Sequence, residues 1–327
     1  MKAAGWIWAA WMCGAVVLPA AAGENAELRW LDGGFAAFGG TSATWRVAAH
    51  GPLAAEGHVA WSLEVGGGVV ARREQSVRLD PAAPASVEIA VDLPAVRAGV
   101  AAEGRLQVAL LDGNRQPLAE LEQPIYVFGR DPAAERKQWL QELDLRLFDP
   151  TGETARRLDE LGWPYRRIAN PAAFAALGGG TLIVGEGCSL RENRGLLETA
   201  IRAAAGGARV VVLAPADGAF APPGPAEGRP GPAALHFRGA EFVRELDKRF
   251  DVPPARAAFR LGGTRAGAEV AVVSADGWGF VEARWSDGGA LMLVGSGLLE
   301  TWESSPVPRH LLVRLLEWAT AKQEKEQ

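Results

Sequence analysis

The spacing of apolar residues changes near Asp131, and this change divides the chain into two parts with different folds. Before Asp131, apolar and polar residues alternate over short runs separated by glycine, proline and aspartate, which is typical of half-buried β-strands. The predicted strands are Leu28 to Leu31, Ala43 to Ala48, Val59 to Val65, Val69 to Leu79, Ser86 to Val91, Leu106 to Leu111 and Leu118 to Phe128. Because no helix-length run interrupts them, they predict a two-layer β-sandwich over residues 24–130.

After Asp131, short apolar strands alternate with helical stretches. A linking helix is predicted within residues 131–142, and strands are predicted at Thr181 to Val184 and Arg209 to Leu213. Their continuous apolar runs are typical of strands covered on both faces. Further strands are predicted at 143–148, 165–168, 257–261, 270–273, 280–285 and 290–294, and helices at 151–161, 171–177, 194–205, 239–249 and 309–321. This order predicts a three-layer α/β domain over residues 143–321, followed by a charged tail at 322–327.

Two connections in the second part have a composition that predicts their structure. Residues 214–232 contain six prolines and four glycines, a composition that predicts a surface loop. The sequence Ser286-Asp287-Gly288-Gly289 joins two apolar runs, and it predicts a β-hairpin.

The first 23 residues have the composition of an export signal. Lys2 supplies a positive charge, the stretch from Ala3 to Ala22 is apolar, and the small residues at its end suit a signal peptidase. Cleavage there would start the mature chain near Glu24, in a secreted or periplasmic protein. The alternative is an uncleaved anchor, because about 20 apolar residues can span a bilayer. With cleavage, we expect no membrane partner.

Charge and cysteine content exclude several classes of function. The chain has 34 Lys and Arg residues against 39 Asp and Glu, a formal charge of -5, and it contains no basic block, so we expect no nucleic-acid partner. Beyond the signal, Cys188 is the only cysteine, so no internal disulfide can form. Four scattered histidines give no zinc-like spacing, and we expect neither a metal nor another cofactor.

Several short motifs in the second part occur in an order known from one superfamily. They are the sequences at 147–152 (LFDPTG), 181–187 (TLIVGEG) and 205–213 (AGGARVVVL), and the late hairpin ending in Gly295. In these motifs the second part resembles the class I glutamine amidotransferase-like superfamily, in the degenerate version attached to secreted bacterial glycoside hydrolases and β-galactosidases. The resemblance implies a flavodoxin-like three-layer fold. The first part is similar to the immunoglobulin-like sandwiches that accompany such hydrolases.

The residues that would make this superfamily active are missing. Its active members place a nucleophilic cysteine in a Gly-x-Cys-x-Gly turn after a strand, and a His-x-Glu pair near the end of the domain. Here the matching strand runs into Ala214-Pro215-Ala216, and His310 is followed by two leucines. Together with the export signal, the resemblance and the missing nucleophile predict an exported, non-catalytic binding or assembly protein in a carbohydrate-utilisation context. The alternative is a glycoside or amide hydrolase that uses carboxylates at strand ends, among them Asp149, Glu186 and Glu300.

Four residues are candidates for binding a ligand. Glu186 follows a parallel strand at the edge where open α/β sheets bind ligands, although a structural carboxylate fits the same position. Trp278, Trp302 and Glu303 lie in loop-like segments, where tryptophan can stack on a sugar or pack beneath the loop. Cys188 also follows a strand, but the glycine of a nucleophile turn is absent two residues later, which favours a structural thiol.

The expected partners follow from the resemblance rather than from a binding motif. They are a carbohydrate, a carbohydrate-active enzyme, or a second copy of this chain, since related domains in β-galactosidases act in oligomer formation. The sequence leaves open whether the interface is with a copy or with a different enzyme.

Overall fold

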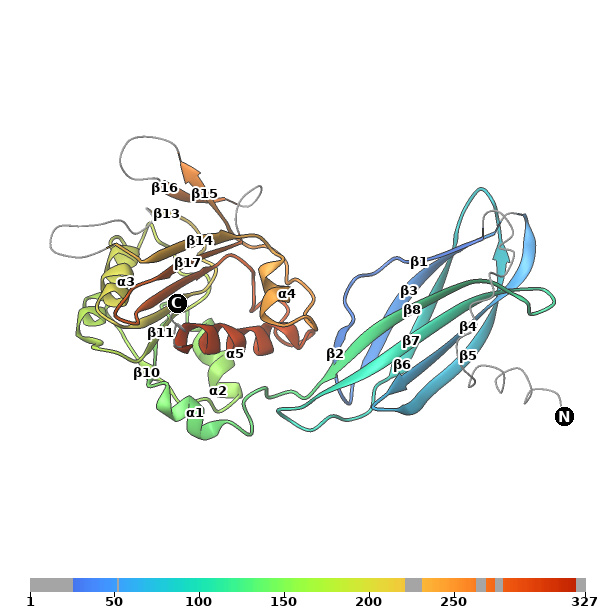
Figure 1. Cartoon of the computed structure of the whole chain (residues 1–327), viewed down its shortest axis with the longest axis horizontal. Coiled ribbons are helices and arrows are strands. Elements are labelled where there is room, and N and C mark those ends of the chain that lie inside the picture. Colours follow the sequence, from blue (N-terminus) through green and yellow to red (C-terminus); the bar gives the residue numbers. More distant parts are fainter. Residues whose placement is uncertain (1–25, 52, 221–230, 263–268, 274–278, 322–327) are drawn as a thin grey trace.

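The computed structural model describes residues 26–51, 53–220, 231–262, 269–273 and 279–321. Figure 1 shows two lobes side by side along the long axis of the molecule. The first lobe, called the sandwich below, contains β1 (Glu27–Trp30), β2 (Ala36–Phe38), β3 (Ser42–His50), β4 (Ala55–Val65), β5 (Gly68–Leu79), β6 (Ala85–Asp92), β7 (Ala101–Asp112) and β8 (Pro117–Phe128).

The sandwich is built from two β-sheets with one core between them. Its sheets have the strand orders β1-β3-β6 and β2-β8-β7-β4-β5. Trp45 from β3 and Trp61 from β4 are each 2% exposed and belong to the same hydrophobic cluster, so the two sheets share this core. Each strand predicted from the alternation is present. The strand β2 was missed because three residues, Ala36 to Phe38, are too few to show a period of two.

The second lobe contains the other elements of the chain. Its helices are α1 (Lys137–Glu142), α2 (Glu153–Glu160), the 3-10 helix η2 (Pro171–Ala176), α3 (Leu196–Ala205), α4 (Phe242–Leu246) and α5 (Val307–Thr320). The main-sheet strands are β9 (Leu145–Phe148), β10 (Arg166–Arg167), β11 (Thr181–Val184), β12 (Arg209–Val212), β14 (Ala234–Arg238), β17 (Phe280–Arg284) and β18 (Ala290–Val294). A separate three-stranded sheet contains β13 (Ala219–Phe220), β15 (Ala258–Gly262) and β16 (Glu269–Val273).

The main sheet of the second lobe is mixed. Its order is β10-β9-β11-β12-β18-β17-β14, with parallel pairing from β10 to β18 and antiparallel pairing of β17 and β14 at one edge. The hairpin of β17 and β18 lies where the sequence predicts it. β14 was not predicted. The helix predicted at 239–249 is only the short α4, and the strands predicted near 257–273 form the separate sheet rather than extend the main one.

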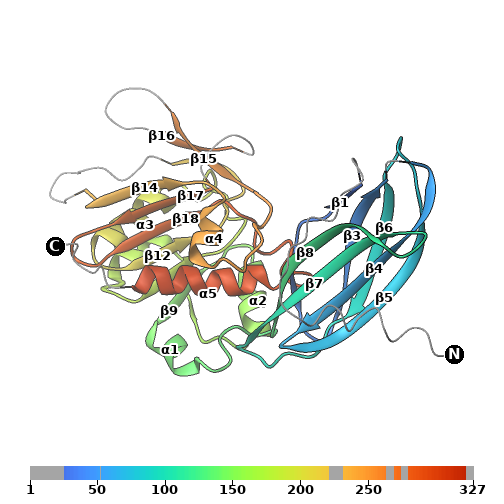
Figure 2. The same ribbon diagram turned by 45° about the vertical axis from the view of Figure 1, so that its right-hand side comes forward.

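Helices cover both faces of the main sheet, which explains its continuous apolar runs. Along β11, Leu182 and Val184 pack into the cluster that contains α3, whereas Ile183 packs into the cluster that contains α5. Figure 2 shows α5 crossing one face of the sheet. Every residue of such a strand is buried on one face or the other, so polar positions do not interrupt it. None of the helices in the described ranges is long and apolar enough to cross a membrane.

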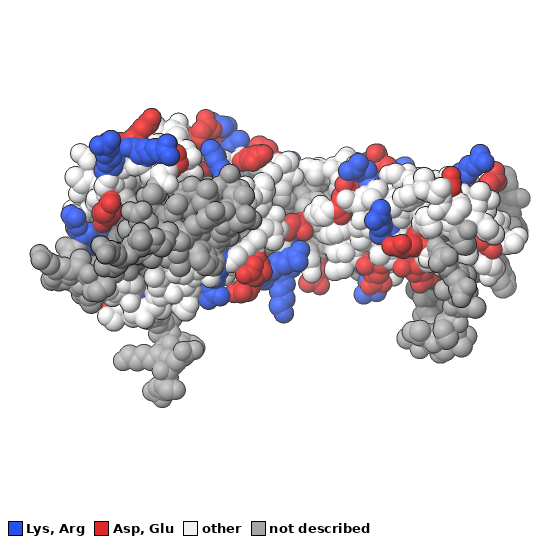
Figure 3. Space-filling view, turned by 90° about the horizontal axis from the view of Figure 1, so that it is seen from above, with Lys and Arg blue, Asp and Glu red and all other residues white. Residues whose placement is uncertain are grey.

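Many charged side chains on the surface lie beside partners of opposite sign. On the face shown in Figure 3, the basic and acidic residues alternate rather than gather in regions of a single sign. Many are ion pairs, such as Arg46 with Asp32 at 2.7 Å and Arg97 with Glu135 at 2.8 Å. Exposed pairs of this kind add little stability, about 0–1 kcal/mol each.

The two lobes contact each other through α5 and the end of β8. Phe128 lies in the core cluster of the second lobe, and the ring of His310 stands 4.5 Å from it between centroids. Arg309 is 5% exposed, and it donates to the carbonyl oxygens of Arg130 at 3.2 Å and Trp302 at 2.9 Å. The junction therefore buries Arg309 and partly buries His310, and the partners of both come from both lobes.

We expect acid to weaken this junction through His310. Burial lowers the pKa of the His310 imidazole to about 4, with smaller contributions from Arg249 and Arg314. Because the unfolded chain takes up the proton near its ordinary pKa of 6.5, the contribution of neutral His310 to stability is complete above pH 6.5 and falls as the pH drops toward 4. Between pH 7.5 and 5 the loss is about 2 kcal/mol.

Urea unfolding at these two pH values measures this loss. His310→Phe keeps a ring against Phe128 but removes the titrating group. The variant should lose about 2 kcal/mol less than the natural chain over the same interval. Equal losses in both chains would contradict the assignment to His310.

Candidate functional site

Open α/β sheets bind their ligands at the carboxyl edge of the parallel strands. Here β9, β11 and β12 end at Phe148, Val184 and Val212. The residues that follow these strands include Asp149 and Glu186, which the sequence also placed at this edge.

Glu186 is buried, and both of its carboxylate oxygens accept hydrogen bonds from within the chain. Glu186 as a whole is 1% exposed. Oε2 accepts from the backbone N–H groups of Leu298 at 2.8 Å and Leu299 at 3.0 Å, and Oε1 accepts from Arg256 at 2.6 Å. The Glu186 N–H donates to the Thr154 hydroxyl at 2.9 Å. This carboxylate therefore holds the segment after β18 against β11.

Asp149 is likewise used inside the fold. Its Oδ2 accepts from the Ala155 N–H at 2.8 Å in the first turn of α2, and its Oδ1 accepts from the Thr151 hydroxyl at 2.8 Å. This is how a side chain caps a helix whose N-cap position, Gly152, has no side chain to do so. Glu300, the third carboxylate of the hydrolase alternative, is exposed.

Cys188 and Ser189 follow Glu186 in the chain, but neither has the surroundings of a nucleophile. Cys188 is 1% exposed, and burial, reinforced by Asp149 and Asp217, raises the pKa of its thiol to about 11. The Ser189 hydroxyl donates to Asp217 at 2.8 Å, and no histidine bonds to it among the residues that the structure describes. The Asn193 side-chain amide donates to the thiol sulfur at 3.6 Å.

We expect Cys188 to be unreactive and replaceable. In residues 24–327 at pH 8, a thiol with a pKa near 11 should resist iodoacetamide while the chain is folded and react once urea is added. Cys188→Ala should lower the free energy of unfolding by about 1–2 kcal/mol, the scale of removing a small buried group. Rapid labelling of the folded chain would contradict a structural thiol.

The other predicted candidates lie in the segment between β18 and α5 or outside the described residues. Trp302 is 1% exposed in the core of the second lobe, so neither face of its ring is open for stacking. Glu303 is on the surface, paired with Arg157 at 2.7 Å and Arg309 at 2.8 Å. Trp278 is outside the described residues. Glu186 contacts the same segment at Leu298 and Leu299, and Arg309 joins Trp302 to Glu303 by donating to the Trp302 carbonyl oxygen and to the Glu303 carboxylate.

Sequence reasoning missed the residues that fix Glu186. Arg256 lies 70 positions away, and Leu298 lies 112 positions away. No local pattern marks them, because two of the three donors are backbone groups. Among the described residues, no cluster of His, Cys, Asp or Glu has the size and spacing to hold a metal ion.

The chain matches no protein-family model and no curated protein. Solved structures do match parts of it at low identity. Fibronectin(III)-like modules of Clostridium thermocellum CbhA are 15% identical over 32% of this chain and 96% of theirs, with a TM-score of 0.20. A glycosyl hydrolase family 2 member from Bacteroides cellulosilyticus is 12% identical over 57% of this chain and 24% of its own, with a TM-score of 0.24.

A putative beta-galactosidase from Bacteroides fragilis is 8% identical over 59% of this chain and 46% of its own, with a TM-score of 0.24. This chain thus spans less than half the length of either of the two enzymes. The structural neighbours include fibronectin(III)-like modules and parts of glycoside hydrolases.

Proposed function

We propose that this protein is an exported, non-catalytic binding or assembly protein of carbohydrate utilisation, whose second lobe is an amidotransferase-like domain without its nucleophile. One observation carries the non-catalytic part of the proposal. At the carboxyl edge of the parallel strands, the polar side chains suited to chemistry, Asp149, Glu186 and Ser189, are all engaged by partners within the chain.

The end of β12 supports the same reading. This is where the resemblance would put a nucleophile, but Leu213 and Ala214 there are buried and apolar. The Ala214 carbonyl accepts the Gly187 N–H at 2.8 Å, so this position joins two loops. His310, the histidine near the end of the domain, packs against Phe128 at the lobe junction. A nucleophile and its base are therefore both lacking at this edge, within the described part of the chain.

The export and carbohydrate parts of the proposal rest on the sequence. They come from the apolar N-terminal stretch and from the resemblance of the motifs at 147–152, 181–187 and 205–213 to domains attached to glycoside hydrolases. Two lobes of this kind, one a sandwich and the other without a nucleophile, provide surface for contact rather than a reaction centre.

Two assays on the purified chain test the proposal. We expect no turnover of a panel of aryl glycosides or of glutamine, and we expect retardation of the protein in affinity gels that contain polysaccharide. Turnover that is reproducible, and that is lost in Asp149→Asn or Glu300→Gln but kept in the exposed control Glu192→Gln, would replace the proposal with the hydrolase alternative. The absence of both turnover and retardation would reject a carbohydrate-binding role.

The assembly role has a separate test. Light scattering on residues 24–327 at micromolar concentrations should give a mass that rises with concentration if the chain self-associates. A constant monomer mass would reject self-assembly and direct attention to a different partner chain, which co-purification would identify.

A further inference from the structure

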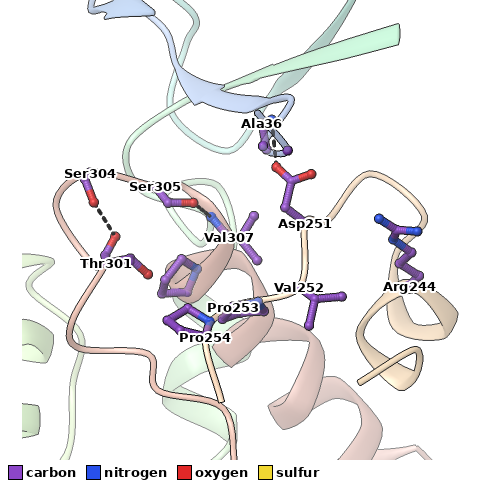
Figure 4. Close-up of a pocket in the computed structure, with 13 residues that line it drawn as sticks. Ala36, Arg244, Asp251, Val252, Pro253, Pro254, Thr301, Ser304, Ser305 and Val307 are labelled. Atoms are coloured by element: carbon purple, nitrogen blue, oxygen red, sulfur yellow. Dashed lines mark hydrogen bonds between the residues drawn. The ribbon is translucent and has the colours of Figure 1, made fainter. Parts of the chain in front are cut away.

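A cavity of about 590 Å³ lies at the junction of the two lobes. Its size falls within the range of about 300–1,000 Å³ typical of small-molecule sites, which often occur between domains. Three segments far apart in the sequence form its walls, as Figure 4 shows. They are the turn before β2 in the sandwich, the segment from α4 to Pro254, and the residues that lead into α5.

The cavity has an apolar part and a polar part. The apolar part contains Val252, Pro253, Pro254 and Pro308. Because proline has a fixed φ angle, this part of the wall is rigid before any ligand arrives. The polar part contains one cation, one carboxylate and three hydroxyl groups, which belong to Arg244, Asp251, Thr301, Ser304 and Ser305.

Arg244 has no ion pair or side-chain hydrogen bond with any residue in the described part of the chain, although most arginines here do. It is exposed on α4 and lines the cavity. A guanidinium offers two parallel N–H groups, a geometry that suits a carboxylate. The Val307 N–H at the start of α5 already donates to the Ser305 hydroxyl at 3.3 Å, which leaves the Ser305 O–H able to donate to a ligand.

Asp251 offers a hydrogen-bond acceptor to the same cavity, where Arg244 offers donors. Its Oδ2 accepts the Ala36 N–H at 3.0 Å across the lobe junction, and its Oδ1 has no partner among the described residues. An acceptor of this kind suits a hydroxyl group. Figure 4 shows Arg244 on one side of the cavity, the hydroxyl residues Ser304 and Ser305 on the other, and Asp251 between them.

We propose that this cavity binds a small carboxylate that carries several hydroxyl groups, of the class of the hexuronic acids. The ligand's carboxylate would pair with Arg244, its hydroxyls would bond to Asp251 and to Ser304 or Ser305, and its C–H face would lie on the proline wall. A neutral sugar would leave Arg244 unused. A planar base would find no aromatic side chain among the lining residues. The inference names a ligand for the binding role proposed above and rests on that role.

Two substitutions probe the cavity by different means. Arg244→Met removes the cation but keeps most of the side-chain length. Gly33→Leu adds bulk at the wall, where a Cβ would meet no atom within 4 Å and the backbone is outside the left-handed region. Lys248→Met is the matched control, because Lys248 is an exposed cation close to α4 that does not line the cavity.

The measurement is isothermal titration calorimetry of the purified chain with glucuronate and galacturonate, with glucose and galactose as neutral counterparts. We expect at least one hexuronate to bind ten-fold more tightly than its neutral counterpart. Arg244→Met and Gly33→Leu should each weaken this binding at least ten-fold, and Lys248→Met should leave it unchanged. Thermal melting of each variant checks that it is folded.

Other outcomes overturn the inference. Hexuronate binding that is unchanged in Arg244→Met would place the ligand elsewhere. If no hexuronate binds while polysaccharide still retards the chain in gels, the assignment of this cavity fails but the binding role stands. If neither binds, both fail.

Discussion

Replacing Glu186 with alanine is expected to lower the free energy of unfolding by about 3 kcal/mol. The substitution leaves the N–H groups of Leu298 and Leu299 without their acceptor. A donor that is buried without a partner costs about 1–3 kcal/mol. Arg256 adds less, because 42% of its side chain is exposed and the guanidinium can turn to water. Urea unfolding of the variant and the natural chain measures the difference.

Two further variants sharpen this test. Glu186→Gln keeps an oxygen for the two N–H groups but turns an N–H₂ group toward Arg256, so we expect a loss of about 1–2 kcal/mol. Glu192→Ala removes an exposed carboxylate from the same loop and should change stability by less than about 0.5 kcal/mol. A fully stable Glu186→Ala would show that this carboxylate does not anchor the fold, and would favour a role toward a ligand.

A second large effect is expected for Gly295→Ala at the end of β18. A Cβ at this position would lie within 3.0 Å of the Ala257 carbonyl oxygen and 2.8 Å from that of Gly279. Both oxygens belong to backbone that is already fixed, since Gly295 donates to Gly279 at 2.6 Å and its carbonyl accepts from Ala257 at 2.8 Å. The methyl group cannot fit unless these segments separate. We expect a loss of about 3 kcal/mol or more.

The measurement is urea unfolding or, if the variant does not accumulate in soluble form, the soluble yield beside the natural chain. Gly113→Ala is the matched control, because a Cβ there meets its nearest atom, the Glu56 carbonyl oxygen, at an ordinary 3.6 Å. It should change stability by less than about 1 kcal/mol. Equal stability of Gly295→Ala and Gly113→Ala would show that the backbone at Ala257 and Gly279 can move away from position 295 at little cost.

The sequence by itself determined those strands in which buried apolar residues recur at a regular spacing. Alternation located the strands of the sandwich, as at β6, which was predicted at 86–91 and found at Ala85–Asp92. The apolar run at Thr181–Val184 gave β11 with the same bounds. These succeed because a strand with one or two buried faces must carry its apolar residues at a fixed period. The hairpin of β17 and β18 could also be predicted from local sequence, because Gly288 in its turn adopts a positive φ angle that other residues avoid.

Only the tertiary structure decided what the candidate residues do. The sequence placed Glu186 at a strand end, but its three donors lie 70, 112 and 113 residues away. Two of the three are backbone N–H groups, which any residue except proline would supply. Trp302 lies in the segment between β18 and α5, as predicted, but its side chain is buried in the core of the second lobe. The junction cavity joins three segments, around positions 33, 251 and 304, whose meeting depends on how two lobes pack. Periodicity reports which face of an element is buried, whereas a site depends on which distant segment lies against that face.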